Sequence, residues 1–278
     1  MKKWLIIAGC LIAAGLIIGT VALALTGFDF AKLGTKEMVT NTYTVEESFT
    51  NISLDAITAD ITFAVSENGG VKVVCHEDKK VPFSVYVEND TLEISCKDNR
   101  KWYDHIGFNW EEGRVTVYLP AGEYGDLQIN CTTGDVTVPE GFSFRNANMD
   151  LTTGDIHWKA AVTNTLSAKT TTGAITVENV QCDTLNAKTT TGNVTLTDVQ
   201  AVETMNLTVS TGDVKLNRVD SGELQIKTTT GDVTGTILSE KVFDAKATTG
   251  DVTVPQSTTG GLCRVTTTTG DIHLKIAE

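Results

Sequence analysis

A glycine recurs through the second half of the chain at a nearly constant interval, usually within a Thr-Thr-Gly-Asp motif. Successive glycines are separated by 19 or 20 residues. They are Gly134, Gly154, Gly173, Gly192, Gly212, Gly231, Gly250 and Gly270. A near-constant period of this size is typical of a solenoid, in which each repeat forms one coil and buries its apolar face only by stacking on its neighbours.

Apolar residues keep the same register on both sides of this glycine. The position seven residues before it is apolar, as at Leu127 and Leu185, and the position two residues after it is always Val or Ile. Apolar and polar residues alternate on each side, which predicts half-buried strands. Glycine permits positive φ and aspartate bonds nearby backbone groups, so the motif predicts a turn. We therefore predict an all-β fold, a β-solenoid of about eight coils of 19–20 residues.

The stretch before the repeats contains strand patterns without the period. Asp60 follows Ala59 in what resembles a worn copy of the repeat. Further predicted strands are Val71–Cys75, Phe83–Val87, Leu92–Cys96 and Val115–Leu119. Turn residues between the second and third of these predict a hairpin. Solenoid ends expose unpaired strand edges, so this region is expected to cap one end, whereas the far end stops at Ile276 to Glu278 without a recognisable cap.

These patterns divide the chain into five predicted segments. They are a cytoplasmic tail (1–4), a transmembrane anchor (5–25), a tether (26–44), an N-terminal β cap region (45–125) and the β-solenoid repeats (126–278).

The first residues predict the location of the protein. Leu5–Leu25 is uncharged and apolar over 21 residues, long enough as a helix to cross a hydrocarbon core of about 30 Å. Lys2 and Lys3 place the N-terminus in the cytoplasm, so we expect a single-pass cell-membrane protein whose C-terminal part is extracellular. Two alternatives remain open: a signal-peptidase site at Ala22–Ala24, and a lipoprotein motif at Ile7–Cys10.

Charge and composition exclude some classes of function. The formal net charge is −13, which disfavours nucleic acid and unaided binding to anionic lipid headgroups or anionic wall polymers, and favours a cationic partner. Four histidines without a Cys-x-x-Cys motif argue against zinc. No cofactor is predicted.

The cysteines allow two interpretations. Of the six in the chain, Cys75 and Cys96 lie on neighbouring predicted strands and form the one plausible disulfide of an exported protein. The alternative is that all the cysteines of the folded part are small buried hydrophobic residues.

The Thr-Thr-Gly-Asp-Val repeats, the Asp-Ile-Thr-Phe segment at Asp60–Phe63 and the strand Val115–Pro120 resemble the bacterial “putative adhesin” family of β-strand-repeat envelope proteins, some of which are called LiaG-like. The resemblance covers residues 45 to 278. It implies an exported or membrane-anchored protein of a Gram-positive bacterium, and some relatives are linked to envelope-stress and antimicrobial-peptide responses. The family defines no catalytic residues.

An aromatic loop is the candidate contact site. It holds Trp102, Tyr103, Phe108 and Trp110. Clustered aromatic residues mark protein interfaces and sugar-binding surfaces. The alternative is that these side chains plug the open end of the solenoid.

The acidic residue after each repeat glycine forms a second candidate. The column comprises Asp135, Asp155, Asp213, Asp232, Asp251 and Asp271, and Ala174 and Asn193 interrupt it. Carboxylates stacked one coil apart repel one another, and Ca²⁺ would remove that repulsion. The alternative, in which Asp and Asn bond backbone N–H groups at the corner, makes the motif structural and leaves no metal site.

No catalytic set emerges from the spacing. The histidines His76, His105, His157 and His273 are scattered, and no Ser-His-Asp or Cys-His arrangement is suggested. We therefore expect a non-catalytic envelope protein that acts in adhesion or the envelope-stress response through a protein, a cationic peptide or a cell-wall ligand. The alternatives are a polysaccharide-acting β-helix enzyme, and an accessory sensor that binds cationic peptides and signals through a membrane partner.

Overall fold

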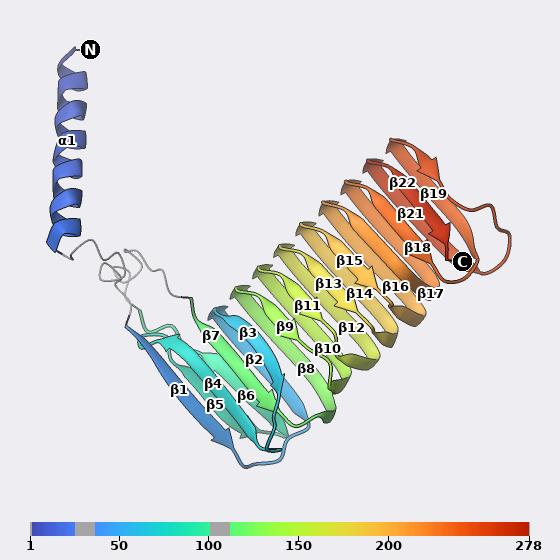
Figure 1. The fold of residues 1–278 in the computed structure, drawn as a ribbon, viewed down its shortest axis with the longest axis horizontal. Helices are drawn as coiled ribbons and strands as arrows, with labels where there is room; N and C mark the ends of the chain where they lie inside the picture. Colours follow the sequence, from blue (N-terminus) through green and yellow to red (C-terminus); the bar gives the residue numbers. More distant parts are fainter. Residues whose placement is uncertain (1, 26–36, 101–111, 278) are drawn as a thin grey trace.

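The computed structural model describes residues 2–25, 37–100 and 112–277, and it shows a rod of stacked strands with a separate helix at the N-terminus (Figure 1). The elements before the repeats are α1 Lys2–Leu25, β1 Met38–Val45, β2 Asn51–Thr58, β3 Asp60–Val65, β4 Val71–Asp78, β5 Phe83–Glu88, β6 Thr91–Cys96 and β7 Arg114–Leu119. Those of the repeats are β8 Gly122–Thr133, β9 Val136–Val138, β10 Phe142–Thr153, β11 Ile156–Trp158, β12 Ala161–Thr172, β13 Ile175–Glu178, β14 Gln181–Thr191, β15 Val194–Thr197, β16 Gln200–Thr211, β17 Val214–Thr230, β18 Val233–Ile237, β19 Lys241–Thr249, β20 Val252–Thr253, β21 Gly261–Thr269 and β22 Ile272–Ile276.

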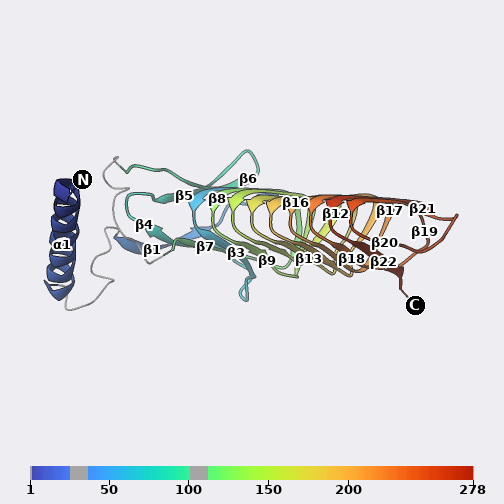
Figure 2. The same cartoon turned by 90° about the horizontal axis from the view of Figure 1, so that it is seen from above.

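Each coil contributes one longer strand and one shorter strand, and these build two facing layers (Figure 2). The long-strand layer runs in the order β5, β6, β2, β8, β10, β12, β14, β16, β17, β21, β19. The short-strand layer runs β1, β4, β7, β3, β9, β11, β13, β15, β17, β18, β22, β20. β17 passes from one layer into the other. The predicted all-β solenoid of about eight coils is therefore confirmed.

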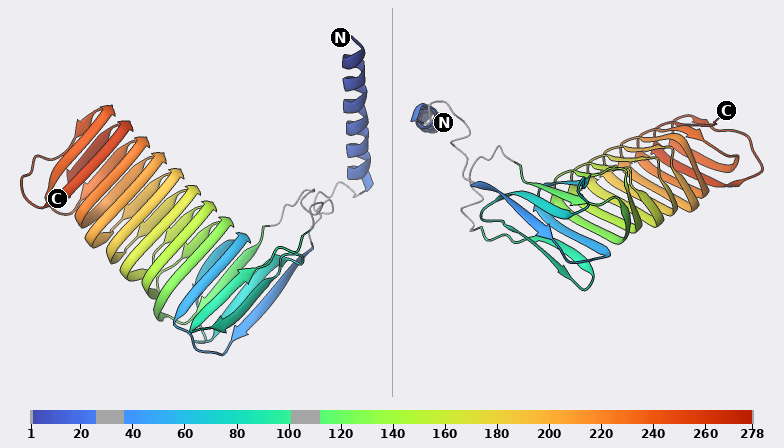
Figure 3. Two further views of the ribbon diagram at one scale, coloured as in Figure 1. Left: turned by 180° about the vertical axis from the view of Figure 1, so that it is seen from behind. Right: turned by 60° about the horizontal axis from the view of Figure 1, so that its bottom comes forward.

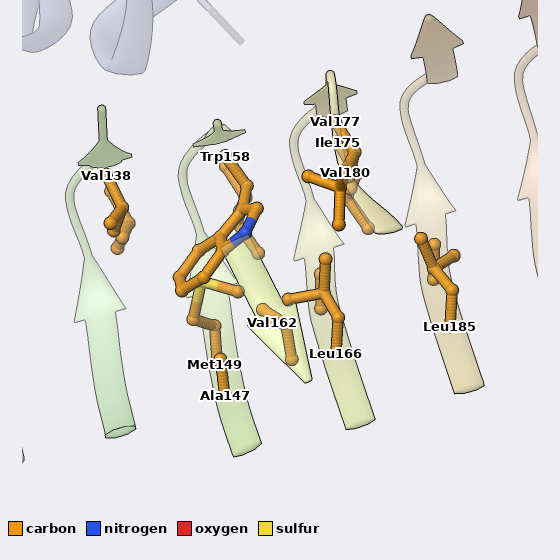
Figure 4. Close-up of a cluster of buried hydrophobic side chains, with 14 of the residues drawn as sticks. Val138, Ala147, Met149, Trp158, Val162, Leu166, Ile175, Val177, Val180 and Leu185 are labelled. Atoms are coloured by element: carbon orange, nitrogen blue, oxygen red, sulfur yellow. The ribbon is translucent and has the colours of Figure 1, made fainter. Parts of the chain in front are cut away.

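The core is the space between the two layers, and it is filled one coil at a time. Parallel pairing sets equivalent residues side by side, as in Leu166 beside Leu185 and Ile175 beside Val194. Figure 4 shows such side chains stacking around Trp158, which is fully buried and donates its indole N–H to the Ala160 carbonyl at 2.7 Å. The alternation in the sequence thus produces a continuous apolar interior, because every second side chain points inward.

The repeat glycine is required by both backbone conformation and space. All eight repeat glycines have φ between +133° and +152°, values that residues with a Cβ rarely adopt. A Cβ at Gly192 would also overlap the carbonyl oxygen of Gly173 in the neighbouring coil. Successive corners therefore stack backbone on backbone, with Gly173 N–H donating to Thr191 O at 2.9 Å.

We predict that Gly192→Ala lowers the free energy of unfolding by roughly 2 kcal/mol or more, because it adds backbone strain to a contact that cannot relax. The matched control is Gly70→Ala: Gly70 is exposed and a Cβ there meets no atom within 4 Å. The control should stay within about 0.5 kcal/mol of the wild type. Denaturant unfolding followed by circular dichroism measures both, and equal effects would contradict the packing argument.

The order of coils differs from the sequence at the far end of the rod. The last coil in the chain, β21–β22, lies between the β17–β18 coil and the β19–β20 coil, so β19 is the outermost strand (Figure 1). The expectation that the rod stops at Ile276 to Glu278 is therefore wrong. Gly261 explains how β21 fits beside β17, because a side chain there would overlap the carbonyl oxygen of Gly222.

At the N-terminal end of the rod the order of coils also differs from the order in the sequence. The worn copy of the repeat, β2–β3, stacks directly on β8–β9, and the Asp135 N–H donates to Asp60 Oδ1 at 2.9 Å as in the regular coils. β6 and β7 then cover this copy, and β1, β4 and β5 join them by antiparallel pairing. The predicted hairpin is the β5–β6 pair, while β1 lies partly within the segment predicted to be a tether (Figure 3).

The N-terminal segment forms α1. No helix in the described part of the chain has both the length and the apolar character that a membrane crossing requires, and the predicted transmembrane anchor at residues 5–25 is not supported by the structure.

The cysteines are free thiols in the structure. Cys75 lies on β4 and Cys96 on β6, which belong to opposite layers, so the expectation that their strands are neighbours is wrong. Burial raises the pKa of Cys75 and of Cys263 to about 12. These thiols are therefore protonated at neutral pH, as expected of small core hydrophobes.

Candidate functional site

The predicted aromatic contact site lies outside the described residues. Trp102, Tyr103, Phe108 and Trp110 all fall within residues 101–111. The other predicted motif, the Gly-Asp corner, is described throughout.

The aspartates of the corner form a ladder along the rod. Five of the six accept a hydrogen bond at Oδ1 from the backbone N–H one coil further on, as in Asp155 N to Asp135 Oδ1 at 2.7 Å and Asp232 N to Asp213 Oδ1 at 3.1 Å; Asp251, in the outermost coil, only donates its own N–H. The ladder follows the spatial order of the coils, because Asp271 bonds to Asp232, and Asp251 to Asp271. Each accepting carboxylate thereby satisfies a donor that the sharp corner leaves without a strand partner.

One of the two interruptions of the column keeps the acceptor role and the other does not. Asn193 replaces Asp and its Oδ1 accepts the N–H of Asp213 at 2.8 Å. Ala174 donates its own N–H to Asp155 Oδ1 at 2.7 Å but has no side-chain acceptor to offer the next coil. Since an amide oxygen serves as well as a carboxylate, the column needs an acceptor rather than a negative charge.

The geometry therefore assigns the corner motif a structural role. Within the described residues, no group of three or more His, Cys, Asp or Glu side chains is arranged to hold a metal ion. Repulsion between neighbouring carboxylates is offset by the backbone dipoles that each one accepts.

We predict that Asp213→Ala destabilises the rod by about 1–2 kcal/mol, because the N–H of Asp232 loses its acceptor. Asp213→Asn should cost less than about 0.5 kcal/mol, since Asn193 already performs this role one coil away. Thermal unfolding of the two variants in parallel tests this. A larger loss for Asn than for Ala would show that charge, and not hydrogen bonding, is what the column provides.

A buried threonine column supports the corner from inside. Thr170 donates to Gly154 O at 3.1 Å and Thr189 donates to Gly173 O at 2.9 Å. Both threonines are almost fully buried. The threonines of the motif thus divide into an inner hydroxyl that satisfies the glycine carbonyl and two outer ones that face solvent, as Thr171 and Thr172 do.

The outer side of the long-strand layer carries three columns of polar residues, which we call the polar face. Parallel pairing aligns an amide column, a charged column and a threonine column across β8, β10, β12, β14, β16 and β17. Their members are Gln128, Asn148, Asn186, Asn206 and Gln225, interrupted by Ser167; Asp150, Lys169, Lys188 and Lys227, with Asn130 and Thr208 in the same column; and Thr132, Thr152, Thr171, Thr190 and Thr229, interrupted by Ser210.

Side chains on the polar face are held to one another along the rod. Asn148 donates to Gln128 Oε1 at 2.8 Å, and Asn206 donates to Asn186 Oδ1 at 2.9 Å. The Lys169 ammonium lies 2.6 Å from Asp150. These exposed contacts add little stability individually, but they hold donors and acceptors in rows about 4.8 Å apart. A regular polar surface of this kind presents the same groups repeatedly to an extended ligand.

Two of the hollows in the surface of the described residues are lined by charged side chains that the repeat pattern does not explain. One, of about 230 Å³, lies in the N-terminal cap and is lined in part by Asp78, Arg100 and Glu112. The buried carboxylate beside it, Glu77, accepts from Asn41 Nδ2 and from the Phe83 N–H, both at 2.5 Å. Glu77 is therefore used to join strands of the cap and is not free for acid–base chemistry.

The second hollow, of about 440 Å³, is an open groove that ends at Lys241. The side chain of Lys241 is only 4% exposed. Its ammonium lies 2.6 Å from Asp220 Oδ1 and donates to Ser221 O at 2.6 Å and to Ser239 Oγ at 2.9 Å. All three of its N–H donors are thus used, and the lysine fastens the start of β19 to the coil of β17. The sequence gives no period-based signal for this residue, because it lies outside the repeat columns.

We predict that Lys241→Met costs about 3 kcal/mol or more, because it leaves the partly buried Asp220 without its cation. The matched variant Lys159→Met removes an exposed pair with Glu178 at 2.8 Å and should cost less than about 1 kcal/mol. Urea unfolding of both variants provides the comparison. Equal costs would mean that burial does not strengthen the Lys241 contacts.

A model of one protein family matches residues 49–183 and again residues 161–278. The chain belongs to the Toastrack DUF4097 family. Membership of this family confirms the resemblance drawn from the Thr-Thr-Gly-Asp repeats.

The chain is also similar, at low sequence identity, to solved structures of bacterial proteins. A “putative adhesin” from Bacteroides fragilis is 16% identical, with 86% of this chain and 98% of that chain covered and a TM-score of 0.41. A “putative adhesin” from Parabacteroides merdae is 12% identical, with 86% and 96% covered and a TM-score of 0.44. A “putative lipid binding protein” from Parabacteroides distasonis is 15% identical, with 85% and 96% covered and a TM-score of 0.40. No curated protein matches the chain.

Proposed function

We propose that this protein is a non-catalytic, membrane-anchored extracellular rod that acts in cell-envelope adhesion or the envelope-stress response. The observation that carries the proposal is the polar face, where rows of amide, charged and hydroxyl groups repeat from coil to coil. Such a surface suits an extended ligand with repeating polar groups, such as a cell-wall polymer, better than it suits a small substrate.

The use of the acidic side chains supports a role without catalysis. The corner aspartates accept backbone N–H groups, and Glu77 joins strands of the cap. Glycoside hydrolysis needs a pair of carboxylates flanking the scissile bond in a cleft. These carboxylates are instead held by structural hydrogen bonds, so the polysaccharide-acting enzyme is the weaker alternative.

The anchor is proposed from the sequence. The uncharged segment Leu5–Leu25 follows two lysines, which favours a single crossing with the rod outside the cell membrane. The net charge of −13 would draw a cationic peptide toward the rod by long-range attraction. An accessory sensor of cationic peptides that signals through a membrane partner is therefore the second candidate.

We predict that the full-length protein in detergent binds purified Gram-positive cell wall with little dependence on salt. Thr190→Arg, on the polar face, should weaken this binding about tenfold by placing a bulky cation in the threonine column. The matched control Thr195→Arg lies on the other outer face of the same coil and should bind as the wild type does. A cosedimentation assay measures all three.

The same assay separates the alternatives. Binding that is lost in Trp102→Ala and Trp110→Ala but kept in Thr190→Arg would move the contact to the aromatic loop. Salt-sensitive binding of a cationic peptide without wall binding would favour the sensor, since screening removes long-range attraction. Release of wall fragments would contradict the non-catalytic role.

A further inference from the structure

The outermost strand of the rod leaves one edge of the long-strand layer open. β19 pairs with β21 on one side, and no other described strand pairs with it. The core beneath it is also uncovered: Val252 is 42% exposed, whereas Val214 and Val233, in the same column of inner coils, are fully buried. An uncovered strand edge above exposed core side chains is a site for adding a further strand.

The two layers treat this end differently. In the short-strand layer the last strand, β20, has two residues, while β18 and β22 have five each. Pro255 follows shortly after β20 and has no N–H to donate, which protects that edge from pairing. In the long-strand layer β19 runs for nine residues without a bulge. The available edge is therefore β19 alone.

β19 is held firmly in place. Its first residue, Lys241, is bound to Asp220, Ser221 and Ser239. Arg264 of β21 lies 3.1 Å from Asp244 on its outer face. A strand fixed in this way loses little conformational freedom when a partner strand is added.

We propose that two copies of this chain associate head to head, by antiparallel pairing of their β19 strands about a two-fold axis at Ala245. The charge pattern of the strand selects this partner and this register. Asp244 and Lys246 flank Ala245 and both face outward, so the two-fold axis sets Asp244 opposite the partner's Lys246 and Lys246 opposite the partner's Asp244. Residues directly opposite in an antiparallel pair share a face, so both contacts join opposite charges.

The inner face of the strand is complementary in the same register. Phe243, Ala245 and Ala247 point toward the core and are half-buried. The two-fold axis sets Phe243 opposite the partner's Ala247, a large residue against a small one, with Ala245 opposite its own copy. Pairing would continue the long-strand layer from one rod into the next and cover the open end of both cores, which makes the contact isologous and closed.

The dimer would also place the two N-termini far apart. The N-terminal cap lies at the opposite end of the rod from β19 (Figure 1). A head-to-head pair therefore has its two N-terminal segments at its outer ends. If each N-terminal segment is anchored in a membrane, which rests on the proposed function, the dimer bridges two membrane surfaces.

The test is a charge exchange across the two-fold axis, read by sedimentation of the full-length protein in one detergent. Asp244→Lys sets Lys against Lys, and Lys246→Asp sets Asp against Asp, so each variant should self-associate about tenfold more weakly than the wild type. A mixture of the two variants restores both opposite-charge contacts and should associate as the wild type does. Lys188→Asp, in the same column at mid-rod, is the matched control and should not change association.

A monomeric wild type would overturn the proposal. Single variants that associate as tightly as the wild type would also overturn it, and this is the result expected if the chains associate through α1. Unchanged melting temperatures of the variants separate a lost interface from misfolding. Tethering of vesicles that carry the protein tests separately whether the dimer bridges two membranes. A dimer that fails to tether vesicles would still support the β19 interface but would contradict the anchored role.

Discussion

The close approach of backbones at the glycine corner is the contact on which the rest of the rod depends. Gly192 sits against the carbonyl of Gly173 with no room for a Cβ, and this spacing lets the strands on both sides pair from coil to coil. The Asp135 carboxylate and the Thr170 hydroxyl then satisfy the polar groups that the corner exposes. A repeat protein of this kind is stabilised mainly at interfaces between neighbouring coils, so one contact is used many times.

This architecture separates stability from function. Residues that face inward or lie at the corners hold the coils together, and the groups available to a ligand lie on the outer faces of the two layers and at the two ends. At one end the cap joins the layers through Glu77 and antiparallel strands. At the other, Lys241 holds a strand whose outer edge remains open. The proposed adhesion through a face and the proposed association through an end are compatible, because they use different parts of the rod.

Local patterns predicted the coil well because each coil carries its own signals. The alternation around Leu185, the turn chemistry of Gly192 and the worn copy at Asp60 all correspond to what the structure shows. The order of coils at the ends was missed for a physical reason. Every coil presents the same columns to its neighbours, so the pattern cannot tell which coil lies beside which. The pairing of β21 with β17 depends on space made by Gly261 and Gly222, which are far apart in the chain.

The sequence by itself determined the period, the alternation along the strands and the turn at each corner, because these follow from residues that are close in the chain. Only the tertiary structure decided that β19 and not the C-terminal strand ends the rod, that Lys241 is buried and paired, and that Asp carboxylates serve backbone donors. Those outcomes depend on which distant segments meet, and contacts between distant segments carry no periodic signature.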